Sequence, residues 1–181
     1  MTNVIKVCIT GAMRCGKDTV GTLLTTRHGF APSIAFGTAL KAYAHLIYPD
    51  VPRTPKPRAL YQFMNVMREY DPLVWIKHVE ASVSYALDRK STTGIVITDA
   101  RQANEVAWCR RNGFVIVRVT APEHVRIARA QSVGDVFDYE DLSHPTETEV
   151  DGFDADYELI NDGDYASLIT KVDALMAEIR K

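Results

Sequence analysis

The sequence has little of what marks several common protein classes. Only three cysteines occur in 181 residues (Cys8, Cys15 and Cys109), and they lack the spacing of a disulfide framework or a metal site. No apolar run approaches the roughly 20 residues that a membrane helix needs. The opening residues MTNVIKVCIT lack the small-residue cleavage site of a secretory signal and instead predict a buried strand. We therefore expect a cytoplasmic protein with reduced thiols and no membrane partner.

Two catalytic patterns are missing as well. The five histidines show neither H-x-H nor H-E-x-x-H spacing, which gives zinc chemistry no support. No serine stands in a G-x-S-x-G pattern, which argues against a hydrolase nucleophile elbow. The chain also lacks internal repeats and linkers. With 46% hydrophobic and 24% charged residues, it predicts one globular domain over residues 1–181.

Net charge is only −2, but its distribution is uneven. Residues 1–130 carry 18 Lys and Arg against 9 Asp and Glu, whereas residues 131–181 carry 3 against 14. This asymmetry indicates either an anion-binding face or merely uneven surface composition. Nucleic acid is not a favoured partner, because the basic residues are not interleaved with aromatic ones on a strand.

Apolar runs and helical periodicities alternate along the chain. Near-continuous runs at 4–9, 94–98 and 114–119 predict strands covered on both faces, and weaker strands are expected at 33–36 and 157–160. Helical spacing extends over 60–67, 76–87 and 165–179, the second behind an Asp71-Pro72 start. The pattern predicts an α/β fold in three layers with a five-stranded, mostly parallel sheet.

The stretch ITGAMRCGKDTVG, residues 9–21, fits the phosphate-binding pattern G-x-x-x-x-G-K between a predicted strand and a predicted helix. Glycines let successive N–H groups face phosphate oxygens, the helix N-terminus adds its positive dipole end, and the lysine reaches the terminal phosphates. The alternative is a glycine-rich turn with a surface lysine. The expected ATP-binding residues are Gly11, Ala12, Met13, Arg14, Cys15, Gly16, Lys17, Asp18 and Thr19.

Asp18 departs from the usual pattern, in which a hydroxyl at this position faces Mg²⁺. The Thr19 hydroxyl is displaced by about 100° around the helix and cannot simply replace it. The Asp18 carboxylate is therefore expected either to hold hydrated Mg²⁺ or to position the acceptor's attacking hydroxyl.

Five segments in order resemble the phage-type deoxynucleoside monophosphate kinases, which are similar to adenylate kinase-like P-loop kinases and, more distantly, to phosphomevalonate kinases. They are GKDT, IAFGTALK (34–41), KPRALYQFMNVMREYDPLVW (56–75), ITDARQANEV (97–106) and LINDG (159–163). The resemblance covers residues 4 to 163. It implies the P-loop kinase fold with ATP on the loop, a helical acceptor-binding insertion at about 38–90 and a short lid at about 124–150.

Moving a phosphoryl group between two anions requires cations that neutralise them and hold them in line. Arg58, Gln62 and Asn65 share one helix face, which suits a nucleoside monophosphate or is merely solvated. Trp75 is either a stacking surface for a base or core packing. The expected acceptor-binding residues are Lys41, Arg58, Gln62, Asn65, Arg68, Trp75 and Arg101.

Asp99 ends an apolar strand at the carboxyl edge of the predicted sheet, where α/β proteins bind ligands. It is expected to hold Mg²⁺ through water or to orient the acceptor, and alternatively to cap the helix starting near Gln102. Arg126 and Arg129 stand three apart on a predicted helix, and the resemblance implies that they are lid arginines; otherwise they are exposed. The expected catalytic residues are Lys17, Asp18, Asp99, Arg126 and Arg129. Of these, Asp18 and Asp99 are expected to hold the metal through water.

The expected activity is transfer of the γ-phosphoryl group of ATP, with Mg²⁺, to a deoxynucleoside monophosphate. The alternatives are a P-loop kinase for another small phosphorylated metabolite and a non-catalytic ATP-binding module. The acidic stretch 132–164 is expected to form a lid segment followed by a short helix around HPTETEV. The assembly is expected to be a monomer or a homodimer, in the host cytoplasm if the protein is of phage origin.

Overall fold

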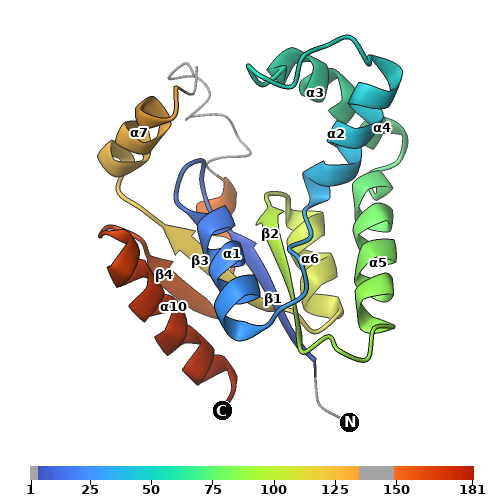
Figure 1. Ribbon diagram of the computed structural model, residues 1–181. Coiled ribbons are helices and arrows are strands. Elements are labelled where there is room, and N and C mark those ends of the chain that lie inside the picture. Colours follow the sequence, from blue (N-terminus) through green and yellow to red (C-terminus); the bar gives the residue numbers. More distant parts are fainter. Residues whose placement is uncertain (1–3, 135–148) are drawn as a thin grey trace.

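A parallel β-sheet forms the centre of the protein, for which a computed structural model describes residues 4–134 and 149–181 (Figure 1). Within these residues the sheet has four strands in the order β2-β1-β3-β4. The strands are β1 (Ile5–Thr10), β2 (Gly94–Ala100), β3 (Val115–Thr120) and β4 (Tyr157–Ile160). β1 is an inner strand that pairs in parallel with both β2 and β3. The loop that follows β1 therefore leaves from the middle of the carboxyl edge.

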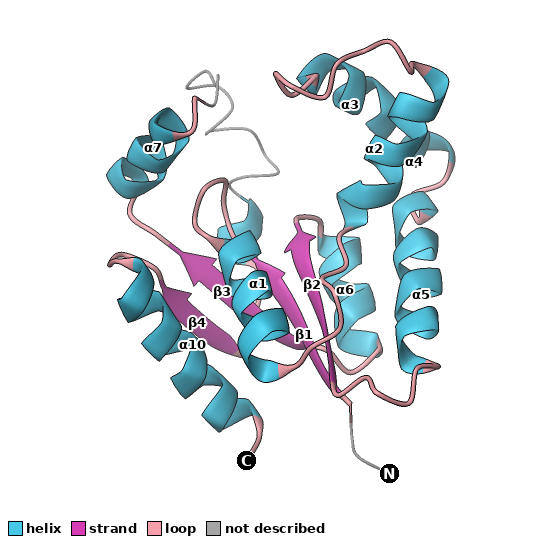
Figure 2. Cartoon of the chain, in the orientation of Figure 1, coloured by secondary structure: helices cyan, strands magenta, loops and turns pink. Residues whose placement is uncertain are grey.

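Helices cover both faces of the sheet (Figure 2). On one face, α1 (Lys17–His28) and α10 (Tyr165–Ile179) pack on a core that includes Val7 and Ile9. On the other, α5 (Val74–Leu87) and α6 (Ala103–Arg111) pack on a core that includes Cys8 and Ile97. Successive strand residues point to opposite faces, so a continuous apolar run supplies both cores. The predicted three-layer α/β fold is confirmed.

Residues 33–36 do not form the fifth strand that the sequence predicts. Ile34 makes only an isolated parallel bridge to Ile97, with its N–H bonded to the Val96 carbonyl at 2.9 Å. Pro32 has no N–H with which to extend a ladder, and helix α2 (Phe36–Ile47) begins directly after the bridge. The chain thus lies along the edge of the sheet at β2 without extending it by a full strand.

Helices α2, α3 and α4 rise beyond the carboxyl edge of the sheet, and α5 returns alongside the sheet (Figure 1). The helix predicted from the spacing over residues 60–67 is interrupted at Val66, which separates α3 (Arg58–Asn65) from α4 (Met67–Tyr70). Its apolar stripe is only partly buried, since Met64 is 1% exposed but Phe63 is 63% exposed. The predicted Asp71-Pro72 helix start is also wrong, because α5 begins at Val74 and Asp71 accepts the Leu73 N–H.

The remaining elements lie around the acidic stretch. Helix α7 (Glu123–Ser132) follows β3, and a short 3₁₀ helix, η1 (Glu149–Gly152), precedes β4. Most of the predicted lid and of the helix around HPTETEV falls on residues 135–148, outside the described residues. In the described part of the chain, no helix is both long and apolar enough to span a bilayer.

Candidate functional site

The phosphate-binding loop connects β1 to α1 and depends on two glycines. Gly11 and Gly16 have φ values of +149° and +100°. A Cβ added at Gly11 would overlap the Val119 carbonyl oxygen, and one at Gly16 would overlap the Asn161 side-chain amide. Only glycine tolerates both the backbone angle and the close approach. The two glycines of the sequence pattern are therefore required by the geometry of the loop.

Lys17 is the first residue of α1 and folds back onto the loop. Its ammonium Nζ donates to the Ala12 carbonyl at 3.2 Å, and the residue is only 5% exposed. Burial lowers the pKa of Lys17, and the positive charge of Arg101 lowers it further. A buried cation with one neutral hydrogen-bond acceptor gains from an anion placed beside it. Lys17 is thus suited to receive a phosphate oxygen.

The carbonyl side of the loop is fastened by Asn161 and by the two arginines of α7. The Asn161 amide Nδ2 donates to the Cys15 carbonyl at 2.8 Å, and Asn161 is 4% exposed. The Arg129 guanidinium donates to the Arg14 and Cys15 carbonyls at 3.4 Å and to both oxygens of Asn161 at 3.2 Å. Arg126 reaches the Met13 carbonyl at 3.5 Å. These contacts hold the loop carbonyls on the side facing α7 and β4.

Asn161 is a site residue that motif analysis missed. It directly follows β4, and its N–H bonds the Thr120 carbonyl at the end of β3, so it lies at the carboxyl edge beside the loop. The available signals were a polar residue at the end of a predicted strand and its place in LINDG (159–163), one of the segments of the resemblance. Those signals are weak, because the Asn161–Cys15 contact joins positions 146 residues apart.

Asp99 at the end of β2 caps a different helix from the one that the sequence suggests. Its two carboxylate oxygens accept the backbone N–H groups of Phe36 at 2.6 Å and Gly37 at 3.0 Å, at the N-terminus of α2. Helix α6 is capped instead at Gln102, whose N–H bonds Glu105 at 3.2 Å. The alternative prediction that Asp99 caps the helix near Gln102 is therefore wrong. Its carboxylate instead ties α2 to the sheet edge beside Lys17.

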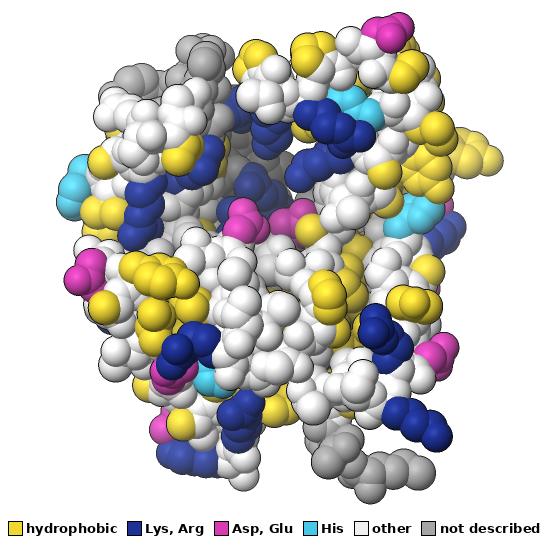
Figure 3. All heavy atoms as spheres, viewed as in Figure 1, with side chains coloured by type: hydrophobic (Ala, Val, Ile, Leu, Met, Phe, Trp, Pro, Cys, Tyr) yellow, Lys and Arg dark blue, Asp and Glu magenta, His cyan; other side chains and the backbone are white. Residues whose placement is uncertain are grey.

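A cavity of about 410 Å³ opens between the P-loop and helices α2 to α4. Figure 3 shows Lys and Arg side chains around a hollow on this face, with acidic side chains at its lower edge. Seven charged or amide residues predicted for the site besides Lys17 and Asp18 line the cavity: Lys41, Arg58, Gln62, Asn65, Arg68, Asp99 and Arg101. It is also lined by Met13, Lys56, Tyr61, Gln102 and Glu105, among others. One cavity therefore joins the loop to most of the predicted acceptor residues.

Trp75 is the predicted acceptor residue that the structure places elsewhere. It is 1% exposed and packs with Leu40, Ala44 and Met64 behind the cavity wall. Its ring is stacked on His78 at 6.2 Å between centroids. Trp75 thus holds α2, α3 and α5 together and does not line the cavity, which corrects its expected place as a stacking surface.

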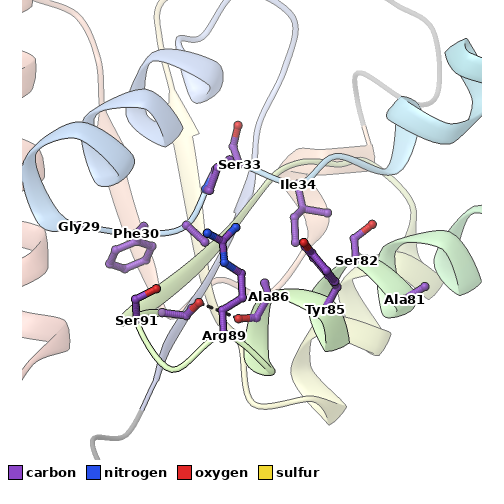
Figure 4. A pocket seen from close by; sticks show the side chains of 13 residues that line it. Gly29, Phe30, Ser33, Ile34, Ala81, Ser82, Tyr85, Ala86, Arg89 and Ser91 are labelled. Carbon is purple, nitrogen blue, oxygen red and sulfur yellow. Dashed lines mark hydrogen bonds between the residues drawn. The ribbon is translucent and has the colours of Figure 1, made fainter.

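A second cavity, of about 700 Å³, lies where the chain enters and leaves the α2–α5 region (Figure 4). Its lining residues include Phe30, Ile34, Tyr85 and Ala86, and Arg89 is the one charged residue among them. It contains neither a phosphate-binding loop nor a carboxylate. The larger cavity therefore lacks the chemistry of a nucleotide site.

Comparison with known proteins places the chain in a family. A family model described as an AAA domain matches residues 7–141. The chain belongs to this AAA domain family. No curated protein matches its sequence.

Solved structures support the same fold. The protein is similar to TT1252 from Thermus thermophilus, with a TM-score of 0.62 and 22% identity over 97% of this chain and 98% of that one. It also resembles shikimate kinase from Acinetobacter baumannii in complex with shikimate, with a TM-score of 0.54 and 16% identity over 98% of this chain and 95% of that one. A gluconokinase from Sinorhizobium meliloti matches with a TM-score of 0.55 at 17% identity, over 97% and 93% of the two chains. The likeness over nearly the whole chain establishes an α/β P-loop kinase fold.

Proposed function

We propose that this protein transfers the γ-phosphoryl group of ATP to a deoxynucleoside monophosphate, giving ADP and a deoxynucleoside diphosphate. One observation carries the proposal: a single cavity joins the P-loop lysine to a wall that bears both cations and carboxamides. Shikimate kinase and a gluconokinase, both kinases by name, are among the similar structures, which supports phosphoryl transfer to a small acceptor.

The mixed chemistry of the wall favours a nucleotide acceptor. Lys41, Arg58 and Arg101 supply positive charge suited to a phosphate, whereas Gln62 and Asn65 are neutral and hydrogen-bond directionally. A nucleoside monophosphate has the same two parts, an anionic phosphate and a neutral base. An acceptor whose only polar groups are hydroxyls and a carboxylate would leave the amide pair without a base edge to bind.

The chain's own groups would bind and orient the two phosphates. Loop N–H groups, the N-terminus of α1 and Lys17 would hold the terminal phosphates of ATP, while Lys41 and Arg58 would hold the acceptor phosphate. Asp99 would fix the N-terminus of α2, and with it Lys41, against the loop. We propose Arg126 and Arg129 as catalytic residues because they contact the loop backbone, and α2 to α5 as the acceptor-binding insertion.

The residues present fit Mg²⁺ held largely through water. Asp18 and Asp99 both line the cavity with Lys17, and each oxygen of Asp99 retains a lone pair beyond its one backbone hydrogen bond. Among the described residues, no group of three or more His, Cys, Asp or Glu gathers as a complete metal site. Phosphate oxygens and water would therefore complete the coordination, and the ion would neutralise phosphate charge.

The test is ADP release from ATP and Mg²⁺ with dAMP, dGMP, dCMP, dTMP, dUMP, hydroxymethyl-dCMP or shikimate offered separately. We expect stimulation by at least one nucleotide and none by shikimate, with Lys17→Ala as the inactive control. Stimulation by shikimate alone would contradict the proposal. ATP binding without any acceptor-dependent release would favour a non-catalytic ATP-binding module.

A further inference from the structure

Arg68 lines the cavity, but its donors are directed at protein oxygens. Nε donates to Asn65 Oδ1 at 2.7 Å, Nη1 to Gln102 Oε1 at 2.8 Å, and Nη2 to Glu105 Oε1 at 2.7 Å. The three partners come from α3 and from the start of α6. The fork of one guanidinium thus ties the helical wall to the edge of the sheet.

The charge of Arg68 is compensated inside the wall. Glu105 is 2% exposed and forms an ion pair with Arg68, whose side chain is 16% exposed. Burial raises the pKa of Glu105, against the opposing effect of the Arg101 N–H and of Arg68. A cation that already neutralises a buried carboxylate has little charge left for a substrate phosphate. Arg68 therefore differs from Lys41, which forms no ion pair with any residue that the structure describes.

The fork also decides how two carboxamides face the cavity. A guanidinium has only donors, so the oxygens of Asn65 and Gln102 must point toward it. Their NH₂ groups then remain for the cavity that both residues line, and neither NH₂ has a hydrogen-bond partner among the described residues. The Gln102 side chain also accepts the Glu105 backbone N–H in the capping box of α6, so it has a second restraint. With a water or lysine in place of Arg68, the Asn65 amide would be able to turn and offer its oxygen instead.

We propose that Arg68 is a positioning residue that fixes Asn65 and Gln102 as hydrogen-bond donors to the neutral head of the acceptor. This inference rests on the proposed function and specifies its acceptor: the ring edge facing this wall presents hydrogen-bond acceptors, such as a carbonyl oxygen. An amino group at the same place would meet two donors and leave both sides unpaired. Arg68 acts on recognition of the ring through the amides, not on the phosphate.

The experiment compares dIMP with dAMP: dIMP has a carbonyl at position 6 beside an N1–H, and dAMP has an amino group at position 6 beside an unprotonated N1. Deoxyribose 5-phosphate, which has no base, reports on the phosphate alone. The variants are Arg68→Lys, which keeps the charge beside Glu105 but loses the fork, and Arg68→Met/Glu105→Gln, which removes both buried charges together. Arg89→Met in the second cavity is the matched control.

For the unaltered protein we expect kcat/KM for dIMP to exceed that for dAMP by about tenfold, the cost of an unmatched hydrogen bond. Both Arg68 variants should bring the dIMP to dAMP ratio of kcat/KM to within about threefold of one, with little change in kcat/KM for deoxyribose 5-phosphate. Arg89→Met should leave the ratio as it is in the unaltered protein. An unchanged ratio would overturn the inference. An equal loss with every acceptor would also overturn it and would make Arg68 a phosphate clamp.

The two proposals fail in different ways. If no deoxynucleotide stimulates ADP release, the proposed function fails, and the inference is then decided by calorimetric binding of dIMP and dAMP to the unaltered protein. Tighter binding of dIMP that is lost in Arg68→Lys would support the positioning role. Equal or undetectable binding of both would overturn it.

Discussion

The two cavities differ in size and in chemistry, and the smaller one has the chemistry of a site. The larger, about 700 Å³, has mostly apolar and hydroxyl-bearing walls with Arg89 as its one charged lining residue. The smaller, about 410 Å³, is lined by the P-loop lysine, two aspartates and a wall of cations and amides. The difference teaches that volume alone is a poor guide to a candidate phosphoryl-transfer site, because transfer depends on charges and donors fixed in advance.

The largest expected effect is on activity, and it compares one substitution in each cavity. Lys17→Ala should lower kcat/KM by about a thousandfold, because a buried cation aimed at the terminal phosphates is lost. Its thermal unfolding should change little, since Lys17 forms no ion pair within residues 4–134 and 149–181. Tyr85→Ala in the larger cavity should leave kcat/KM within about twofold. Steady-state kinetics and calorimetry measure both, and equal losses in the two variants would contradict the comparison.

The next effect is a loss of stability on truncating Trp75, which packs behind the wall of the smaller cavity. Trp75→Ala should lower the free energy of unfolding by about 3–5 kcal/mol, because it removes a 1% exposed ring from the contact of α2, α3 and α5. Tyr85→Ala, at a side chain that is 70% exposed, should cost about 0.5 kcal/mol or less. Denaturant unfolding gives both values. A small loss at Trp75 would show that the wall is held by other contacts.

A smaller effect is expected where the P-loop is fastened. Asn161→Leu removes the donor to the Cys15 carbonyl and one partner of Arg129, so the loop amides should be less well aimed at phosphate. ATP binding should weaken by about tenfold to a hundredfold, with less change in affinity for the acceptor. Isothermal calorimetry measures each ligand. Asn112→Ala at the end of α6 is the control and should bind ATP normally.

The smallest expected effect is a pH dependence. The raised pKa of Glu105 means that the folded protein holds its proton to higher pH than the unfolded chain does. The stability from protonated Glu105 is fully present below the ordinary glutamate pKa and is lost as pH rises through the raised pKa. Relative to Glu105→Gln, the unaltered protein should therefore gain stability as pH falls from neutral. Unfolding curves across pH measure this difference, and the opposite slope would contradict it.

Local patterns predicted much of the fold and of the nucleotide side of the site. The continuous apolar runs predicted the parallel strands, because odd and even positions along such a strand are both buried between two helical layers. The loop pattern located Gly11, Gly16 and Lys17, since its spacing is fixed by the backbone path around phosphate. The face shared by Arg58, Gln62 and Asn65 followed from helical periodicity and does line the cavity. Whether these residues bind substrates stays a prediction.

What required the tertiary structure was the choice of partner for side chains with several possible partners. Asp99 binds α2 amides 62 and 63 residues away, and Arg68 meets Glu105 from 37 residues away. Pro32 and the early start of α2 removed a strand that apolar content alone suggested. The sequence by itself determined the four strands of the sheet and the place of the P-loop between β1 and α1, because those depend on neighbours in the chain. Only the packed structure decided which charges are compensated and which face the cavity, because that depends on residues brought together by folding.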